Sequence, residues 1–181
     1  MKELSLHILD IVENSINAGA TWVKISIKEE REKNLMTITI TDNGKGMDED
    51  TVKKVVDPFF TTRTTRRVGL GIPLFAQAAK MAGGDFKITS KLGMGTKVEA
   101  TFIKNHIDLQ PLGNMADTLV TLCALYPHVE FIYEHSVDDK IFVFDTGEIK
   151  KRLNDVPINH PLVLDFIKDY VDSNLKSILE V

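Results

Sequence analysis

The spacing of apolar residues predicts a chain that begins with a helix and continues into paired strands. Apolar side chains recur every three or four residues between Leu4 and Ala18, which predicts an amphipathic helix. Residues 22–27 and 36–41 alternate between apolar and polar side chains, so each is expected to form a strand. A charged turn at residues 29–33 should join the two strands as a hairpin.

The spacing of apolar residues also predicts the helices and strands that follow, up to about residue 105. We expect a short helix with Asp48 as its N-cap, a loop rich in threonine and arginine, a longer helix and two strands around a glycine-rich turn. These elements are expected, in that order, at residues 48–56, 57–68, 69–82, 86–90 and 97–102. The whole order predicts an α+β sandwich of two layers, with helices on one face of a mixed, largely antiparallel sheet.

The pattern changes after about residue 105. Helices are expected at residues 114–125, 148–153 and 161–179, and a hairpin at residues 129–135 and 140–144. This segment has apolar residues of its own and carries no motif that assigns it a role. We therefore expect two units, residues 1–105 and a small α/β subdomain at residues 106–181 that docks on the first.

Composition narrows the classes of function. The chain has 181 residues, of which 43% are hydrophobic and 27% charged, as expected for a folded protein with a substantial core. A net charge of −4 argues against duplex nucleic acid as the main partner. No signal peptide or membrane span is evident, so a cytoplasmic location is expected. The single cysteine, Cys123, lies in an apolar stretch and should be a buried, inert thiol.

Three polar residues of the first helix could form a metal and phosphate site. Asp10, Asn14 and Asn17 are spaced four and three residues apart and share one face of the helix. The amide oxygen of Asn14 could bind Mg²⁺, with phosphates and water as the other ligands. Asp10 could orient or deprotonate a nucleophile near a terminal phosphate. Considered alone, this face is better explained as a solvated surface, and only the glycine motifs further along favour the site.

The segment Asp42-Asn43-Gly44-Lys45-Gly46-Met47 follows the second strand. A buried carboxylate at Asp42 could accept a hydrogen bond from the amino group of adenine, while Gly44 and Gly46 leave room for the base. Asp-Asn-Gly is also favourable β-turn chemistry, so the motif is moderately specific by itself.

Glycines further along could admit phosphates. Gly69-Leu70-Gly71 opens a predicted helix, whose free N–H groups suit an anion. The loop before it contains Thr61, Thr62 and Arg63 and could close over a triphosphate. Thr96 follows a second glycine-rich segment, which is otherwise a simple hairpin turn. The Walker and dinucleotide-binding glycine motifs are absent, which predicts a different kind of nucleotide pocket.

The order of these motifs resembles that of the Bergerat-type ATPases, which include DNA gyrase B, heat-shock chaperone ATPases, MutL and histidine kinases. The run from Ile11 to Thr21 resembles the first motif of MutL, and the run from Asp57 to Arg63, followed by Gly69 to Ile72, resembles a histidine kinase. The resemblance covers about residues 4–103 and implies that Mg²⁺ binds at Asn14, adenine at Asp42 and phosphates at the glycines. Asp10 takes the position at which hydrolysing members carry a glutamate base. The expected ATP-binding set is Asn14, Asn17, Asp42, Gly44, Gly46, Met47, Thr61, Thr62, Arg63, Gly69, Leu70, Gly71 and Thr96.

The resemblance leaves three functions open. In histidine kinases a helical dimerisation segment with a phosphoacceptor histidine precedes the ATP domain, whereas nine residues precede Asp10 here. The chain therefore resembles the stand-alone anti-sigma-factor kinases, and a regulatory kinase acting on a partner protein is the first hypothesis. A slow ATPase that acts as a conformational switch is the second, and a non-catalytic nucleotide-binding module is the third. The sequence identifies neither the partner nor the oligomeric state.

Overall fold

The computed structural model describes residues 2–57 and 70–180. The helices are α1 (Leu4–Asn17), α2 (Glu49–Val55), α3 (Gly71–Met81), α4 (Met115–Leu125), α5 (Thr146–Leu153) and α6 (Pro161–Leu179). The strands are β1 (Trp22–Glu30), β2 (Leu35–Asp42), β3 (Phe86–Lys91), β4 (Gly95–Ile103), β5 (Glu130–Val137) and β6 (Lys140–Asp145). Each predicted helix and strand within the described residues is present. The predicted loop at residues 57–68 lies outside them apart from Asp57.

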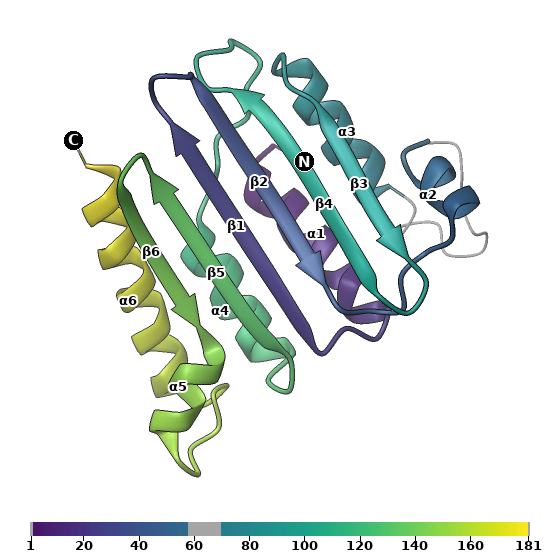
Figure 1. Cartoon of the computed structure of the whole chain (residues 1–181). Helices are drawn as coiled ribbons and strands as arrows, with labels where there is room; N and C mark the ends of the chain where they lie inside the picture. The colour runs from purple at the N-terminus through teal and green to yellow at the C-terminus, as the bar shows by residue number, and fades with distance from the viewer. Residues whose placement is uncertain (1, 58–69, 181) are drawn as a thin grey trace.

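The strands form one sheet in the order β3-β4-β2-β1-β5-β6. The β1–β5 pair is parallel and the remaining pairs are antiparallel. Helices α1, α3, α4 and α6 lie behind this sheet in Figure 1, whereas α2 and α5 lie at its margins. The predicted fold class, helices on one face of a mixed and largely antiparallel sheet, is confirmed.

The alternation in the strands explains which face is covered. In β1 and β2, Ile25, Ile27, Ile38 and Ile40 are at most 1% exposed. They point toward the helices, while threonine and lysine occupy the alternate positions on the open face. The buried side chains form one continuous core that extends from α1 to α6.

Local capping signals fix several helix ends. Asp48 accepts a hydrogen bond from Thr51 N at 2.8 Å, which confirms it as the N-cap of α2. Asn114 caps α4 in the same way by accepting from Asp117 N at 3.0 Å. Pro161 opens α6, where the missing backbone N–H costs nothing.

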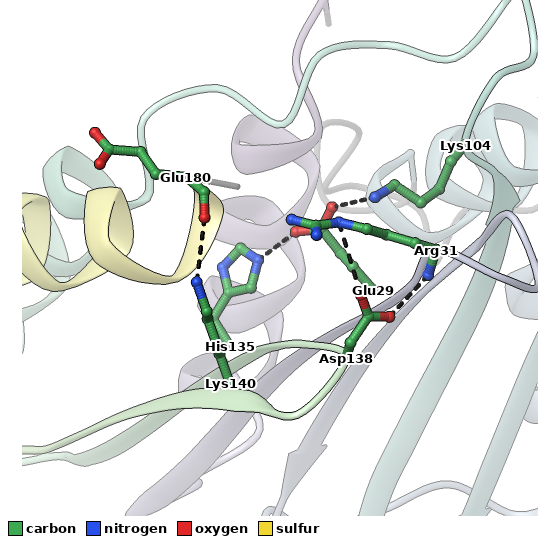
Figure 2. Close-up of polar contacts among 7 residues, drawn as sticks. All are labelled: Glu29, Arg31, Lys104, His135, Asp138, Lys140 and Glu180. Carbon is green, nitrogen blue, oxygen red and sulfur yellow. Dashed lines mark hydrogen bonds and ion pairs between the residues drawn. The ribbon is translucent and has the colours of Figure 1, made fainter.

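The C-terminal segment joins the fold differently from the expectation of a docked subdomain. Strand β5 pairs with β1 along its whole length, so residues 130–145 extend the sheet of the first unit. The predicted turn at residues 29–33 is also shorter than expected, because β1 continues to Glu30. There Glu29 accepts a hydrogen bond from Nε2 of His135 in β5 at 2.6 Å, as Figure 2 shows. Alternation predicts a strand but not which strand lies next to it.

Two further expectations concern single features. Cys123 is 1% exposed, so the predicted burial of its thiol is confirmed, and burial raises the pKa of this thiol to about 12. Among the described residues, no helix combines the length and the apolar character that crossing a bilayer requires.

Candidate functional site

A cavity of about 320 Å³ lies between α1, the ends of β2 and β4, α2 and α3. Its apolar walls come from Ile11, Ala18, Ile40, Val55, Ile72 and Val98. The remaining lining residues are mostly polar: Asn14, Ser15, Asp42, Lys45, Gly46, Met47, Thr51 and Thr96. Apolar walls with a few polar groups are typical of a small-molecule site.

Asp42 is the buried charge of this cavity. It is 8% exposed and its carboxylate accepts three hydrogen bonds. Ser15 Oγ donates to Oδ2 at 2.6 Å, while the backbone N–H groups of Gly44 and Thr96 donate to Oδ1 at 2.8 and 3.3 Å. A carboxylate has about four acceptor positions, so one remains on Oδ2. Asp42 is thus rigidly held and can accept a further N–H donor from within the cavity.

The loop after Asp42 is anchored on two sides through the backbone of Lys45. Lys45 N donates to Ala18 O at 2.9 Å, and Gly93 N donates to Lys45 O at 2.7 Å. Gly46 has a φ of +71°, and a Cβ atom there would lie 2.0 Å from Lys91 O. A side chain at Gly46 would therefore push the loop off the β3–β4 turn and distort the cavity wall.

The turn that leads into β4 supports Asp42 from the other side. Gly95 has a φ of +98°, and a Cβ atom there would lie 2.0 Å from Asp42 O. Because Gly95 lets the two backbones meet, Thr96 N comes within reach of the Asp42 carboxylate. Ser90 Oγ also contacts Thr96 Oγ1 at 2.8 Å and accepts from Met47 N at 2.8 Å, so one hydroxyl ties β3 to the loop.

Asp10 and Asn14 meet the first residue of α3. A Cβ atom on Gly71 would lie 3.0 Å from Asp10 Oδ2 and 3.4 Å from Asn14 Nδ2. The N-terminal N–H groups of α3 have no partner within the helix and carry its positive dipole end. Burial raises the pKa of Asp10, and the nearby His7 opposes this shift. An acid, an amide and a helix N-terminus therefore converge beside the cavity.

His7 lies one turn before Asp10 and packs as part of the core. It is 2% exposed, its Nε2 contacts Gln110 Oε1 at 3.0 Å, and its ring centre lies 5.7 Å from that of Phe75. Burial lowers the pKa of this imidazole, while the hydrogen bond to Gln110 raises it in part. The ring thus acts as a spacer between α1 and α3.

Several predicted residues do not line the cavity. Asn17 is exposed at the end of α1, and Leu70 is 41% exposed at the N-cap of α3. Gly44 lies behind Asp42, where a Cβ atom would be 3.0 Å from Ala18 O. The predicted residues Thr61, Thr62, Arg63 and Gly69 lie outside the described residues.

Comparison with known proteins identifies the family of this domain. The profile of the histidine kinase-, DNA gyrase B- and HSP90-like ATPases matches residues 2–106, more than half of the chain. The chain belongs to this family. The described cavity therefore lies in an ATP-binding domain of the histidine kinase-like type, and all of its lining residues fall inside the matched region.

Relatives in sequence include sensor proteins and signalling kinases. A putative sensor protein of Shewanella frigidimarina is 35% identical over 103 residues, which cover 56% of this chain and 16% of that protein. The signal transduction histidine-protein kinase AtoS of Escherichia coli is 34% identical over 108 residues, which cover 59% of this chain and 17% of that protein. The chain thus aligns with about a sixth of the length of each relative.

Solved structures share the fold. The MutL ATPase domain of Aquifex aeolicus, solved with ADP, superposes with a TM-score of 0.52 at 19% sequence identity. The match covers 84% of this chain and 68% of that domain. The N-terminal domain of a DNA repair protein superposes with a TM-score of 0.53 at 16% identity, over 79% of this chain and 52% of that one. These similarities confirm the Bergerat-type architecture expected from the motif order.

Some residues of this ATPase domain were not predicted from the motifs. Ser15 donates the shortest hydrogen bond to Asp42, yet a serine within a helix has no pattern that marks it as a partner. Lys45, Thr51 and Val55 line the cavity from the loop and from α2. Lys45 lies inside the predicted Asp42–Met47 motif, so that motif could have identified it. The positions of Thr51 and Val55 depend on how α2 packs.

The polar side chains of the cavity fit a nucleotide better than a metal ion held by protein ligands alone. Within residues 2–57 and 70–180, no group of three or more histidine, cysteine or acidic residues could hold a metal ion. Asn14 offers a single amide oxygen, which suits a hard cation whose other ligands are phosphate and water oxygens.

Proposed function

We propose that this chain binds Mg-ATP in the cavity and transfers the terminal phosphoryl group to a protein partner. The acceptor position left on Asp42 is the observation that carries the proposal. It is buried, it opens to the cavity, and the other donors to the same carboxylate hold it in place. The amino group of adenine is a donor of the required kind, and Ile40 and Val98 offer apolar surface to a planar ring.

The opposite side of the site suits the phosphates. Asn14 lines the cavity and lies next to the N-terminus of α3, where free N–H groups attract anions. Asn14 would hold Mg²⁺, which supplies charge neutralisation between the phosphate oxygens. Gly71 leaves this approach open, because a side chain there would meet Asp10 and Asn14.

Asp10 is the group proposed to accept the proton of the nucleophile. In the transfer, a hydroxyl or imidazole of the partner forms a bond to the terminal phosphorus, the bond to the ADP oxygen breaks, and the proton of the nucleophile passes to Asp10. Its burial disfavours the charged form and so raises its affinity for a proton. Kinases are prominent among the relatives in sequence, which supports a protein as the acceptor.

Slow hydrolysis is the second candidate. The same carboxylate beside the same helix N-terminus could orient water instead of a partner side chain, and the resemblance of the first motif to MutL favours this alternative. ATP would then act as a switch of conformation. A module that binds nucleotide without reacting is the third possibility.

Calorimetry tests the binding step. Titration of the native protein with ATP should release heat when Mg²⁺ is present and much less when EDTA is added. Asn14→Ala should reduce affinity in Mg²⁺ and leave the weaker affinity in EDTA unchanged, because the change removes a cation ligand. The absence of heat with the native protein in Mg²⁺ would contradict the proposal at its base.

Labelled ATP separates the three reactions. After incubation with γ-labelled ATP and a cell extract, a kinase transfers label to a protein band, an ATPase releases free phosphate, and a module does neither. Asp10→Asn should abolish whichever turnover is seen while ATP still binds. Turnover that survives this change would remove Asp10 from the reaction.

A further inference from the structure

The two edge strands of the sheet, β3 and β6, differ in how they are protected against pairing with another chain. The open face of β3 carries Lys87, Thr89 and Lys91, all exposed and polar. The open face of β6 carries Ile141 and Val143, which are 59% and 46% exposed. Charged residues on an edge strand normally discourage pairing with another chain. Strand β6 pairs with β5 on one side, and among the described strands its other edge has no partner.

Helix α6 presents an apolar stripe next to this edge. Leu162, Phe166 and Tyr170 recur every four residues and are 72%, 57% and 39% exposed. The rings of Phe166 and Tyr170 stack with centres 5.7 Å apart, and Tyr170 meets Phe142 of β6 at 5.6 Å. A groove of about 620 Å³ runs between β6, α5 and α6. Strand edge and helix stripe thus form one surface across both layers of the fold, at the left of Figure 1.

We propose that this surface, the β6–α6 edge, binds a second copy of the chain. A two-fold axis perpendicular to the sheet would pair the two β6 strands antiparallel. The same rotation brings sheet beside sheet and helix layer beside helix layer, so the two α6 stripes meet as the strands pair. A single foreign strand would cover the β6 edge but leave the stripe on α6 exposed.

Charges at the two ends of β6 fit this arrangement. Antiparallel pairing places the start of one β6 beside the end of the other. Lys140 at the start would meet Glu148 of the second copy, and Arg152 after the end would meet Asp139 of the second copy, each contact occurring twice by symmetry. Within the described residues neither Asp139 nor Arg152 forms an ion pair, and the Glu148–Lys151 pair is highly exposed. Charge complementarity therefore favours a second copy aligned in this sense.

This interface is independent of the ATP site. The cavity lies under β2 and β4, and β1 and β5 separate these strands from β6. The paired sheet would leave both cavities open at its far ends. Loss of the interface should therefore leave nucleotide binding unchanged, and loss of nucleotide binding should leave the interface intact.

Light scattering during size-exclusion chromatography tests the proposal with the full chain. The native protein should elute with the mass of two copies, and Val143→Lys and Phe166→Lys with the mass of one. Both side chains are already exposed in the single chain, so neither change should unfold it. Leu92→Lys is the matched control, because Leu92 is 64% exposed at the β3–β4 turn, and it should stay dimeric. A native protein that remains monomeric overturns the proposal and leaves the surface to a foreign partner, and a dimeric Val143→Lys protein also overturns it.

A charge exchange tests the antiparallel arrangement itself. Lys140→Glu and Glu148→Lys should each weaken the dimer by about tenfold or more, because each variant meets like charge in its own second copy. In a one-to-one mixture of the two variants, both contacts regain opposite charges, so the mixture should dimerise again at native concentrations. A mixture no more dimeric than its components would show the arrangement to be wrong.

Discussion

Two carboxylates on the central strands lie at opposite ends of the sheet, and both point to its helix-covered face. Asp42 ends β2 and pairs in register with Val23, whereas Glu29 lies near the end of β1 and pairs with Met36. The side chain of Glu29 is 12% exposed and Asp42 is 8% exposed, so burial hardly separates them. Burial of a carboxylate alone therefore does not indicate function.

The donors to the two carboxylates do differ. Asp42 accepts from a hydroxyl and two backbone N–H groups, all neutral, which leave its charge uncompensated. Glu29 accepts from Lys104 Nζ at 2.9 Å and from His135 Nε2 at 2.6 Å, as Figure 2 shows. Tyr133 O–H in turn donates to His135 Nδ1 at 2.7 Å, which completes a chain of satisfied groups. Glu29 holds β1, β5 and the end of β4 together, and Asp42 keeps capacity for a ligand.

Asp42→Asn should have the largest effect and act on binding. The new amide keeps an oxygen for Gly44 and Thr96 but turns an N–H toward the cavity, where adenine offers another donor. ATP affinity should fall by about a hundredfold or more, which corresponds to about 2.7 kcal/mol. Calorimetry measures the affinity, and the free energy of unfolding in urea should change by less than about 1 kcal/mol.

Glu29→Gln makes the same chemical change at the other carboxylate and should act on stability. It leaves Lys104 without a counter-charge and weakens the bond from His135, at a cost of about 1–3 kcal/mol in the free energy of unfolding. ATP affinity should stay at the native value. Weaker ATP binding by Glu29→Gln together with normal ATP binding by Asp42→Asn would reverse the roles assigned to the two carboxylates.

The pH dependence of the Glu29→Gln effect sharpens this result. Burial would raise the pKa of Glu29, but hydrogen bonds from His135 and Lys104 lower it below its usual 4.5. A lowered native pKa means that the unfolded chain binds more protons, so the stabilisation by Glu29 is complete above pH 4.5 and is lost as the pH falls through the native pKa. The difference in unfolding free energy between native and Glu29→Gln proteins should therefore shrink in acid.

The sequence predicted Asp42 but not Glu29, and the reason is physical. The backbone segments around Asp42 approach one another so closely that they require glycine. The local glycine pattern and the resemblance to a family therefore both indicated Asp42. Glu29 was expected in a charged turn, because nothing local indicates that β1 continues or that a parallel strand brings His135 to it. Capping by Asp48 could be predicted, since the contact spans three residues, whereas the contact of Ser15 with Asp42 spans 27.

Tyr133→Phe acts on the hydrogen-bond chain of Glu29 and should have a smaller effect on stability. Burial raises the pKa of Tyr133, so its hydroxyl stays protonated and donates to His135 Nδ1. Its removal leaves that buried nitrogen without a donor, at a cost of about 1.5 kcal/mol in unfolding free energy. Thermal or urea unfolding measures the loss, and ATP affinity should not change. A stability equal to that of the native protein would mean that water replaces the hydroxyl.

Ser15→Ala is the matching change at Asp42 and should have the smallest effect. The Ser15 hydroxyl donates to Asp42 Oδ2 at 2.6 Å, the oxygen that keeps the remaining acceptor position. Without this bond the carboxylate is less firmly oriented, so ATP affinity should fall by about fivefold, or about 1 kcal/mol. The two hydroxyl deletions then form a pair: Tyr133→Phe lowers stability at constant affinity, whereas Ser15→Ala lowers affinity more than stability. If Ser15→Ala changed stability alone, the Asp42 carboxylate would belong with Glu29 as part of the scaffold.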